Sequence, residues 1–431
     1  MRLLTETSKT FSLLTGAALI AALSGGCGDD SSADTDTGND GTTTTDTPAT
    51  TDTPDTDDAT PQTTGETEAD TEAEDETTAG ETGEPACEVE PGEWDAPDWD
   101  ANAADALAVR AALDTLTGGT TMRGAETGDV DIASIDELTA LWDGDPSLAD
   151  AANPGFLPVV QDSFEEFMTI LAAGEQDLTD EMGVWTPGPD GGIWAEDFRG
   201  INEGGMEVRQ IVDKGGYSAG LMYHYAATQT EGDITPATMD AIAAAWGNNA
   251  DLDPEGDLTD AAGYALGMGF HADMASALTR AKAFAGDEAC GAERDAAVVQ
   301  FFNLWEQSMY ARMVFYGNRA EGRLLKATED ANFAAVLHDL SEGVGLIAGF
   351  TGLPDYEGPL AGTRISTQAD VDAVMDVFGV DLGDLGASTS GPFVESLPDF
   401  EAAVTGSEEI VIDVFGVTPE EIAEYAMPTP G

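Results

Sequence analysis

The sequence predicts an all-α domain that follows an export signal and a disordered acidic tether. From about residue 94 onward, apolar residues recur at the spacing of one helix face, as they do at Phe164, Phe167, Met168 and Leu171. Alternation of apolar and polar residues, the pattern of a half-buried strand, is weak throughout. Its best candidate, residues 409–414, could form one short strand or the start of a helix.

Capping residues mark several helix starts. Ser134 and Glu137 have the spacing of a capping box, and Thr235 and Thr418 each precede a proline at the first helical position. We expect the main helices at residues 102–116, 135–142, 200–228, 236–246, 258–284, 292–326 and 330–350.

The N-terminus has the layout of an export signal. Basic residues precede an apolar run at residues 11–23, and small residues then lead to Cys27. That run is too short to span a bilayer as a helix of the mature protein. The segment resembles the bacterial lipobox, with Ser24 where a large aliphatic residue is usual. We expect a lipoprotein signal peptide at residues 1–26 and an acylated Cys27, with an ordinary secretory signal as the alternative.

A tether is predicted at residues 27–90. Between residues 28 and 84 the chain has no Lys, Arg or aromatic residue, so it cannot bury enough apolar surface to offset its ordering entropy. The folded part is expected as a helical bundle domain at residues 91–350, with a C-terminal helical extension at residues 351–431 packed on the same domain.

The folded part is strongly acidic. Residues 85–431 hold 64 Asp or Glu against 13 Lys or Arg, a net charge near −51. Such a field repels nucleic acid and anionic lipid surfaces. We expect no nucleic acid partner and contact with a membrane through the N-terminal lipid only. The expected location is the cell envelope, on the outer membrane or cell surface rather than the inner membrane.

Two cysteines remain once Cys27 is assigned to lipid. In an oxidising compartment Cys87 and Cys290 are expected to form a disulfide, and two buried or free thiols are the alternative.

Glycines are frequent inside the expected helices, although each costs about 1 kcal/mol relative to alanine there. Four pairs lie one turn apart: Gly200/Gly204, Gly216/Gly220, Gly263/Gly267 and Gly345/Gly349. Each pair would give a helix a flat strip that another backbone can approach, which predicts tight packing within a bundle.

One segment of the sequence repeats. Residues 213–224 and 260–271 share the pattern D-x2-G-Y-x2-G-x2-[YF]-H, so His224 and His271 occupy equivalent places. If the two copies formed parallel helices, both imidazoles would lie at similar heights near the packing face.

That geometry would permit a metal or small-ligand site. Imidazole and carboxylate ligands together suit iron or zinc. The candidate metal ligands are His224, His271, Asp273 and Glu207. The alternative is a duplicated packing motif with two core histidines, each hydrogen-bonded to its neighbours. His338, the third histidine, is expected to be a half-buried helix residue capped by its own neighbours.

No catalytic residue is expected. The sequence has no G-x-S-x-G motif, no H-E-x-x-H motif and no phosphate-binding glycine loop. Residues 251–258 have the pattern of the first part of a calcium-binding loop, but Ala262 stands where the bidentate Glu should be. An acidic loop between two helices is therefore the better interpretation. A peptidase is disfavoured because no zinc-ligand pair adjoins a general base.

A block at residues 204–215 resembles the imelysin-like envelope lipoproteins, and most closely an uncharacterised branch of that family. It contains Glu207, Gln210, Lys214 and Gly215 in a G-x-E-x-x-Q-x-x-x-K-G run. The resemblance covers about residues 100–350 and implies an all-α fold of helical bundles linked to iron acquisition. Gly269 and His271 match the family's G-x-H-x-x-E signature, with Met274 in place of its Glu.

The resemblance and the export signal together imply an envelope-anchored lipoprotein whose helical domain binds a ligand without catalysis. The resemblance implies iron or an iron carrier as the ligand, and the candidate imidazole and carboxylate ligands would also suit zinc. The alternative is an adhesion or envelope interaction protein that binds no small molecule.

Overall fold

The fold was analysed in a computed structural model of the 431-residue chain. It describes residues 87, 92–176, 190–194, 198–254, 261–330, 333–394 and 396–427. The expected signal peptide, the acylated Cys27 and all of the tether at residues 27–90 except Cys87 lie outside the described residues.

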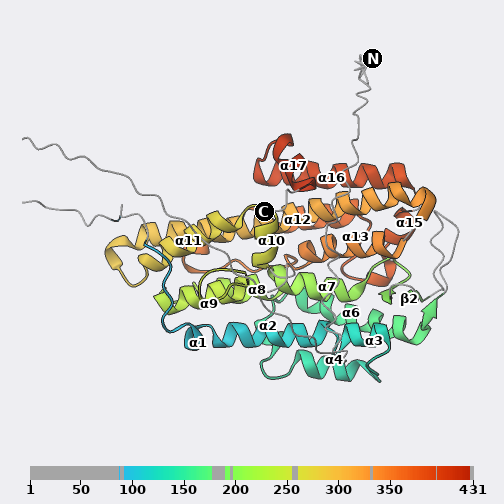
Figure 1. Ribbon diagram of the computed structural model, residues 1–431, viewed down its shortest axis with the longest axis horizontal. Coiled ribbons are helices and arrows are strands. Elements are labelled where there is room, and N and C mark those ends of the chain that lie inside the picture. Colours follow the sequence, from blue (N-terminus) through green and yellow to red (C-terminus); the bar gives the residue numbers. More distant parts are fainter. Residues whose placement is uncertain are drawn as a thin grey trace, which may run out of the picture. The chain divides into compact units, whose positions relative to one another are not determined.

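The described chain is mostly helical, which confirms the all-α prediction. Two long helices, α12 (Gly291–Asp330) and α13 (Phe333–Ala348), pack against each other, and α7 (Val208–Gly215) packs on the other side of α13 (Figure 1). Because α13 lies between these two helices, almost every side chain along it is buried. Charged residues on α13 therefore need partners on its neighbours.

The N-terminal helices pack below α7 in the view of Figure 1. They are α1 (Trp99–Asn102), α2 (Ala104–Thr117), α3 (Met122–Thr127), α4 (Ile135–Trp142), α5 (Leu148–Ala151) and α6 (Phe156–Ala173). The expected capping box of α4 does not form: the Ser134 side chain makes no capping bond, and Glu137 Oε2 accepts from the Ala133 amide at 3.4 Å.

A small sheet follows α6. Strand β1 (Glu175–Gln176) pairs in parallel with β2 (Gly192–Trp194), and β2 pairs antiparallel with β3 (Arg199–Ile201). The helix predicted from residue 200 is therefore wrong at its start. Gly205 has a φ of +83°, a left-handed conformation that reverses the chain before α7 begins.

The two copies of the sequence repeat fold differently. In the first, α7 leads into a π-helical turn (Gly216–Gly220) that is kinked at Ser218, where ψ is −109°, and α8 (Met222–Thr228) follows. The single helix predicted up to residue 228 is therefore broken here. In the second, α10 (Ala261–Gly267) ends, Gly269 turns with a φ of +82°, and His271 begins α11 (His271–Ala283). The single helix predicted for residues 258–284 is thus two. Between the copies, α9 (Pro236–Trp246) begins at a capping box on Thr235, as expected.

The C-terminal elements pack on the same bundle. They are α14 (Gln368–Val377), α15 (Ser390–Val394), α16 (Leu397–Phe415) and α17 (Pro419–Ala426). Helices α16 and α17 both contact α12, and Thr418 caps α17 as predicted. Residues 409–414 belong to α16, so they are helical and do not form a strand, but they lie at the end of that helix and not at its start.

Glycines bring α13 and the α7 region into backbone contact. A Cβ added at Gly345 would lie 2.6 Å from the Gln210 carbonyl oxygen, and one added at Gly349 would lie 2.5 Å from that of Gly215. The prediction of tight glycine packing is confirmed for Gly345/Gly349. Gly216 and Gly220 are also closely packed, against Leu113 and Phe156. Gly200 and Gly204 are not helical.

Cys87 and Cys290 form the predicted disulfide, with their Cα atoms 5.6 Å apart. It joins the chain before α1 to the short 3-10 turn (Glu288–Cys290) that precedes α12. Within the described residues, no helix is both long and apolar enough to cross a membrane.

Candidate functional site

The block at residues 204–215 forms one polar face of α7. Glu207 immediately precedes the helix, and Gln210 and Lys214 follow at three and seven positions further on. Side chains at this spacing lie on the same side of a helix, which here faces α13. All three are buried, with exposed fractions of 0%, 3% and 4%.

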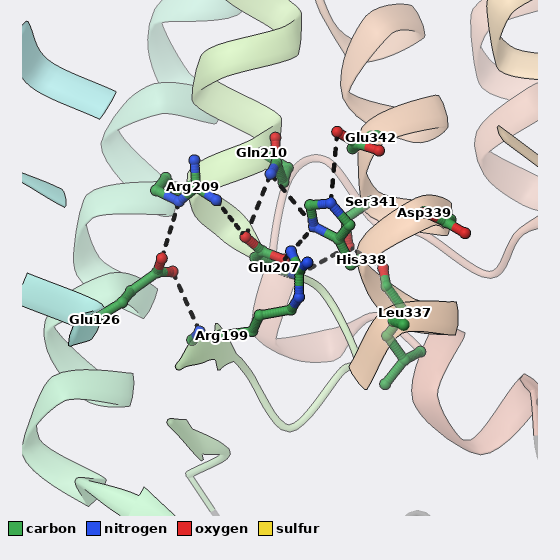
Figure 2. Close-up of polar contacts among 12 residues, drawn as sticks. Glu126, Arg199, Glu207, Arg209, Gln210, Leu337, His338, Asp339, Ser341 and Glu342 are labelled. Atoms are coloured by element: carbon green, nitrogen blue, oxygen red, sulfur yellow. Dashed lines mark hydrogen bonds and ion pairs between the residues drawn. The ribbon is translucent and has the colours of Figure 1, made fainter. Parts of the chain in front are cut away.

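These side chains meet His338 on α13. His338 Nδ1 lies 2.7 Å from Glu207 Oε2 and 3.3 Å from Gln210 Nε2, and its Nε2 lies 3.5 Å from Glu342 Oε1 (Figure 2). The expectation of a half-buried histidine beside its own neighbours is wrong, since His338 is 7% exposed and its shortest contact comes from another helix. His338 thus lies between two carboxylates.

On one side of His338, Glu207 is paired with arginines. Its Oε1 accepts from Arg209 Nη2 at 2.7 Å, and Arg199 Nη1 lies 3.6 Å from its Oε2. Burial alone would raise the pKa of Glu207, but His338 and Arg209 hold it well below its ordinary value. Arg209 also pairs with Glu126 of α3 at 2.9 Å. Burial raises the pKa of Glu126 in spite of that arginine.

On the other side, two carboxylates of α13 face α12. Glu342 lies 2.8 Å from Arg319 Nη2 and 3.5 Å from Lys214 Nζ. Burial opposes ionisation of Glu342, but His338, Lys214 and Arg319 together lower its pKa to about 2. Asp339 pairs with Arg319 at 2.5 Å and with Arg323 at 3.0 Å, although burial still raises its pKa.

Three neighbouring side chains of α13 could hold a metal ion: His338, Asp339 and Glu342. In the described part of the chain they are the one group of three His, Cys, Asp or Glu residues whose ligand atoms all lie within 4.8 Å of one another. Asp339 Oδ2 is buried and makes no hydrogen bond, because Arg323 Nε approaches it without hydrogen-bond geometry. That oxygen therefore retains a lone pair for another partner.

The four ligands predicted from the sequence do not come together. His224 pairs with Tyr356 through a 2.8 Å contact between Nδ1 and the phenolic oxygen. His271 pairs with Asn248 at 3.1 Å and stacks on Trp246 with ring centroids 4.9 Å apart.

The two remaining predicted ligands also have separate surroundings. Asp273 is exposed in the first turn of α11. Glu207 alone reaches a histidine, and that histidine is His338. The physical reason is that the backbone breaks at different places in the two copies: at the kink of Ser218 before His224, and at the turn of Gly269 directly before His271.

The sequence contains a pattern that could have indicated the site residues that were not predicted, His338, Asp339 and Glu342. His338 and Glu342 stand one helical turn apart in a segment whose other polar residues are Asp339 and Ser341, and a helix this rich in apolar residues is usually buried. A buried His and Glu require partners, and the block at 204–215 supplies them.

Comparisons with known proteins found no relative of this chain. A scan against models of protein families, a search of curated proteins and a search of solved structures each gave no match.

Proposed function

We propose that this chain is an envelope-anchored lipoprotein with an imelysin-like helical domain that binds a divalent metal ion, iron or zinc, without catalysis. The relevant site is the cluster around His338, in place of the His224/His271 pair. The observation that supports it is the setting of His338: one ring nitrogen is held by Glu207 and the other faces Glu342, with Asp339 close by.

The two ring nitrogens would have different roles. When Nδ1 donates its proton to Glu207 and Nε2 has given up its own proton to make room for the metal, the imidazole has its lone pair on Nε2, the nitrogen that faces Glu342. Histidines that bind metals are commonly oriented in this way by a carboxylate on the far nitrogen. Imidazole with two carboxylates is a ligand set that iron and zinc accept.

Metal titration of three histidine variants tests the site. The full mature chain in detergent is stripped of metal and titrated with Zn²⁺, with Co²⁺ as a spectroscopic probe. We expect His338→Gln to lower the affinity at least about 100-fold, because one of three ligands is lost. The matched controls His224→Gln and His271→Gln should bind as the wild type does. Unchanged binding by His338→Gln, or loss only in the controls, would contradict the assignment.

Anchoring rests on Cys27 and is tested separately. Cys27→Ser should release the protein from the membrane fraction into the soluble envelope fraction, because no acyl chain can be attached. Persistent membrane association of this variant would contradict the lipoprotein proposal.

A second candidate, an interaction protein that recognises a basic partner, is favoured by the placement of charge. Among the Lys and Arg residues whose burial the structure describes, Arg280 is the one exposed side chain, whereas exposed Asp and Glu occur on most helices. Binding of a cationic polypeptide such as polylysine, weakened by salt and unchanged in His338→Gln, would support this function. Saturable metal binding at His338 would support the first.

A further inference from the structure

The carboxylates of the proposed metal site already have positive partners. Asp339 contacts Arg319 and Arg323, and Glu342 contacts Arg319 and Lys214. Arg319 is common to both, and its Nη2 alone lies 2.5 Å from Asp339 Oδ1 and 2.8 Å from Glu342 Oε2. One guanidinium nitrogen therefore bridges the two oxygen ligands.

The two cations at Glu342 differ in their freedom to move. The Lys214 side chain is 5% exposed, pairs with Asp213 at 3.3 Å, and lies 5.5 Å from the Tyr264 ring centroid. The Arg319 side chain is 21% exposed, so it reaches the edge of the cluster.

Aromatic rings line the position of Arg319 on α12. Its guanidinium lies 4.8 Å from the Tyr316 ring centroid and 5.4 Å from that of Phe315. The Arg312 guanidinium lies closer to both rings, 4.6 Å from the Tyr316 centroid and 4.3 Å from that of Phe315, so Arg319 shares its aromatic neighbours with a second cation.

We infer that Arg319 is the resident counter-ion of the His338 site, and that a metal ion binds by exchange with its guanidinium. This inference rests on the proposed metal-binding function and names the residue that sets its affinity. A divalent ion placed between Asp339 and Glu342 would compete for the oxygens that Arg319 contacts. Arginine stays protonated in proteins, so it relieves the repulsion only by moving away.

Replacing Arg319 by Gln should strengthen metal binding. The substitution removes the competing charge without touching a ligand, so the affinity of the full chain for Zn²⁺ should rise at least about tenfold, or about 1.4 kcal/mol. The matched control is Arg280→Gln, which removes the same charge from an exposed side chain of α11. It should change the affinity by less than about threefold.

A second variant, Arg319→Lys, keeps the inference testable if Arg319→Gln does not fold. Arg319→Lys keeps the charge but replaces the planar fork by a compact ammonium, so it should fold and tighten Zn²⁺ binding by a smaller factor. Circular dichroism establishes the fold, and Co²⁺ absorption in the visible range establishes that the ion has protein ligands. Equal or weaker binding by every folded Arg319 variant, with the wild type binding normally, would overturn the inference.

Different results would contradict the metal-binding function and the exchange of the metal ion with Arg319. If neither the wild type nor any Arg319 variant binds Zn²⁺ or Co²⁺, the metal-binding function itself is wrong. If the wild type binds and loses binding in His338→Gln, but Arg319→Gln binds no tighter, only the counter-ion exchange is wrong.

Discussion

His224 and His271 show how two residues with the same sequence context acquire different surroundings. Each is half-buried, and each has one polar partner, a phenol for His224 and an amide for His271. Burial lowers the pKa of both, only partly offset by Glu231 near His224 and by Asp253 near His271. A sequence repeat predicts which residue types recur, but the backbone between them decides what they face.

The lowered pKa values predict a pH dependence of folding. Because the unfolded chain takes up protons on these histidines near pH ~6.5, before the folded chain does, their contribution to stability is present above that pH and lost as the pH falls through the folded-state pKa. Urea unfolding of the wild type and of the His224→Gln/His271→Gln double variant at about pH 7.5 and pH 5 measures it.

Comparing the wild type with the double variant removes the effect of the carboxyl groups, because both proteins contain them. Buried carboxyls with raised pKa values, such as Glu126 and Glu306, change stability in the opposite direction and are shared by both proteins. The wild type should lose more stability than the double variant between the two pH values. Equal losses would show that neither histidine contributes.

At the scale of elements, sequence patterns located helices well where a cap and an apolar face coincide. Helices α9, α12 and α13 are close to their predicted ranges. The errors occur at Gly205, at the kink of Ser218 and at Gly269. Glycine is compatible both with a helix interior and with the left-handed turns found at Gly205 and Gly269. Residues 409–414 have β-branched side chains, yet burial of Val411 against the bundle keeps them helical.

The candidate site was predicted only in part for a related reason. The block at 204–215 gave Glu207, but its partner His338 lies 131 positions further along the chain. Only the packing of α13 against α7 shows which faces of the two helices meet. No spacing rule relates residues on different helices.

Backbone contact between α13 and the α7 region can be tested with alanine. Gly349→Ala should destabilise the fold by about 1–3 kcal/mol, because its Cβ would lie 2.5 Å from the Gly215 carbonyl oxygen. Gly322→Ala in α12 is the matched control: its Cβ meets nothing within 4 Å, so the change should stabilise the helix by about 0.5–1 kcal/mol. Urea unfolding measures both. A neutral Gly349→Ala would show that the two backbones can separate at little cost.

Across the described part of the molecule, acidic side chains are exposed on most helices, whereas most basic side chains are buried or half-buried. The sequence predicted the large negative charge, but not that Arg209, Lys214 and Arg312 would be buried. Those cations compensate carboxylates that the bundle encloses, such as Glu207 and Glu342. The surface is consequently more uniformly acidic than the composition alone implies. Salt should therefore stabilise the fold by screening repulsion between surface carboxylates.

The disulfide acts on the whole molecule because it closes a long loop. Cys87 and Cys290 are separated by 203 positions, so reduction frees the unfolded chain from a large constraint. We expect dithiothreitol to lower the free energy of unfolding by about 2–5 kcal/mol, the usual cost of losing a native disulfide. Cys87→Ser should lose a similar amount and should no longer respond to the reductant.

The two cysteines provide an internal comparison for that prediction. Cys290 is 4% exposed, whereas Cys87 is half-buried in the chain before α1. Loop closure affects both serine variants equally, but Cys290→Ser also places a hydroxyl in a buried position, so it should be the less stable of the two. A Cys87→Ser variant as stable as the oxidised wild type would show that the bridge adds nothing. The chain before α1 would then be held by its other contacts, such as the 3.1 Å hydrogen bond from Trp94 Nε1 to the Ala250 carbonyl oxygen.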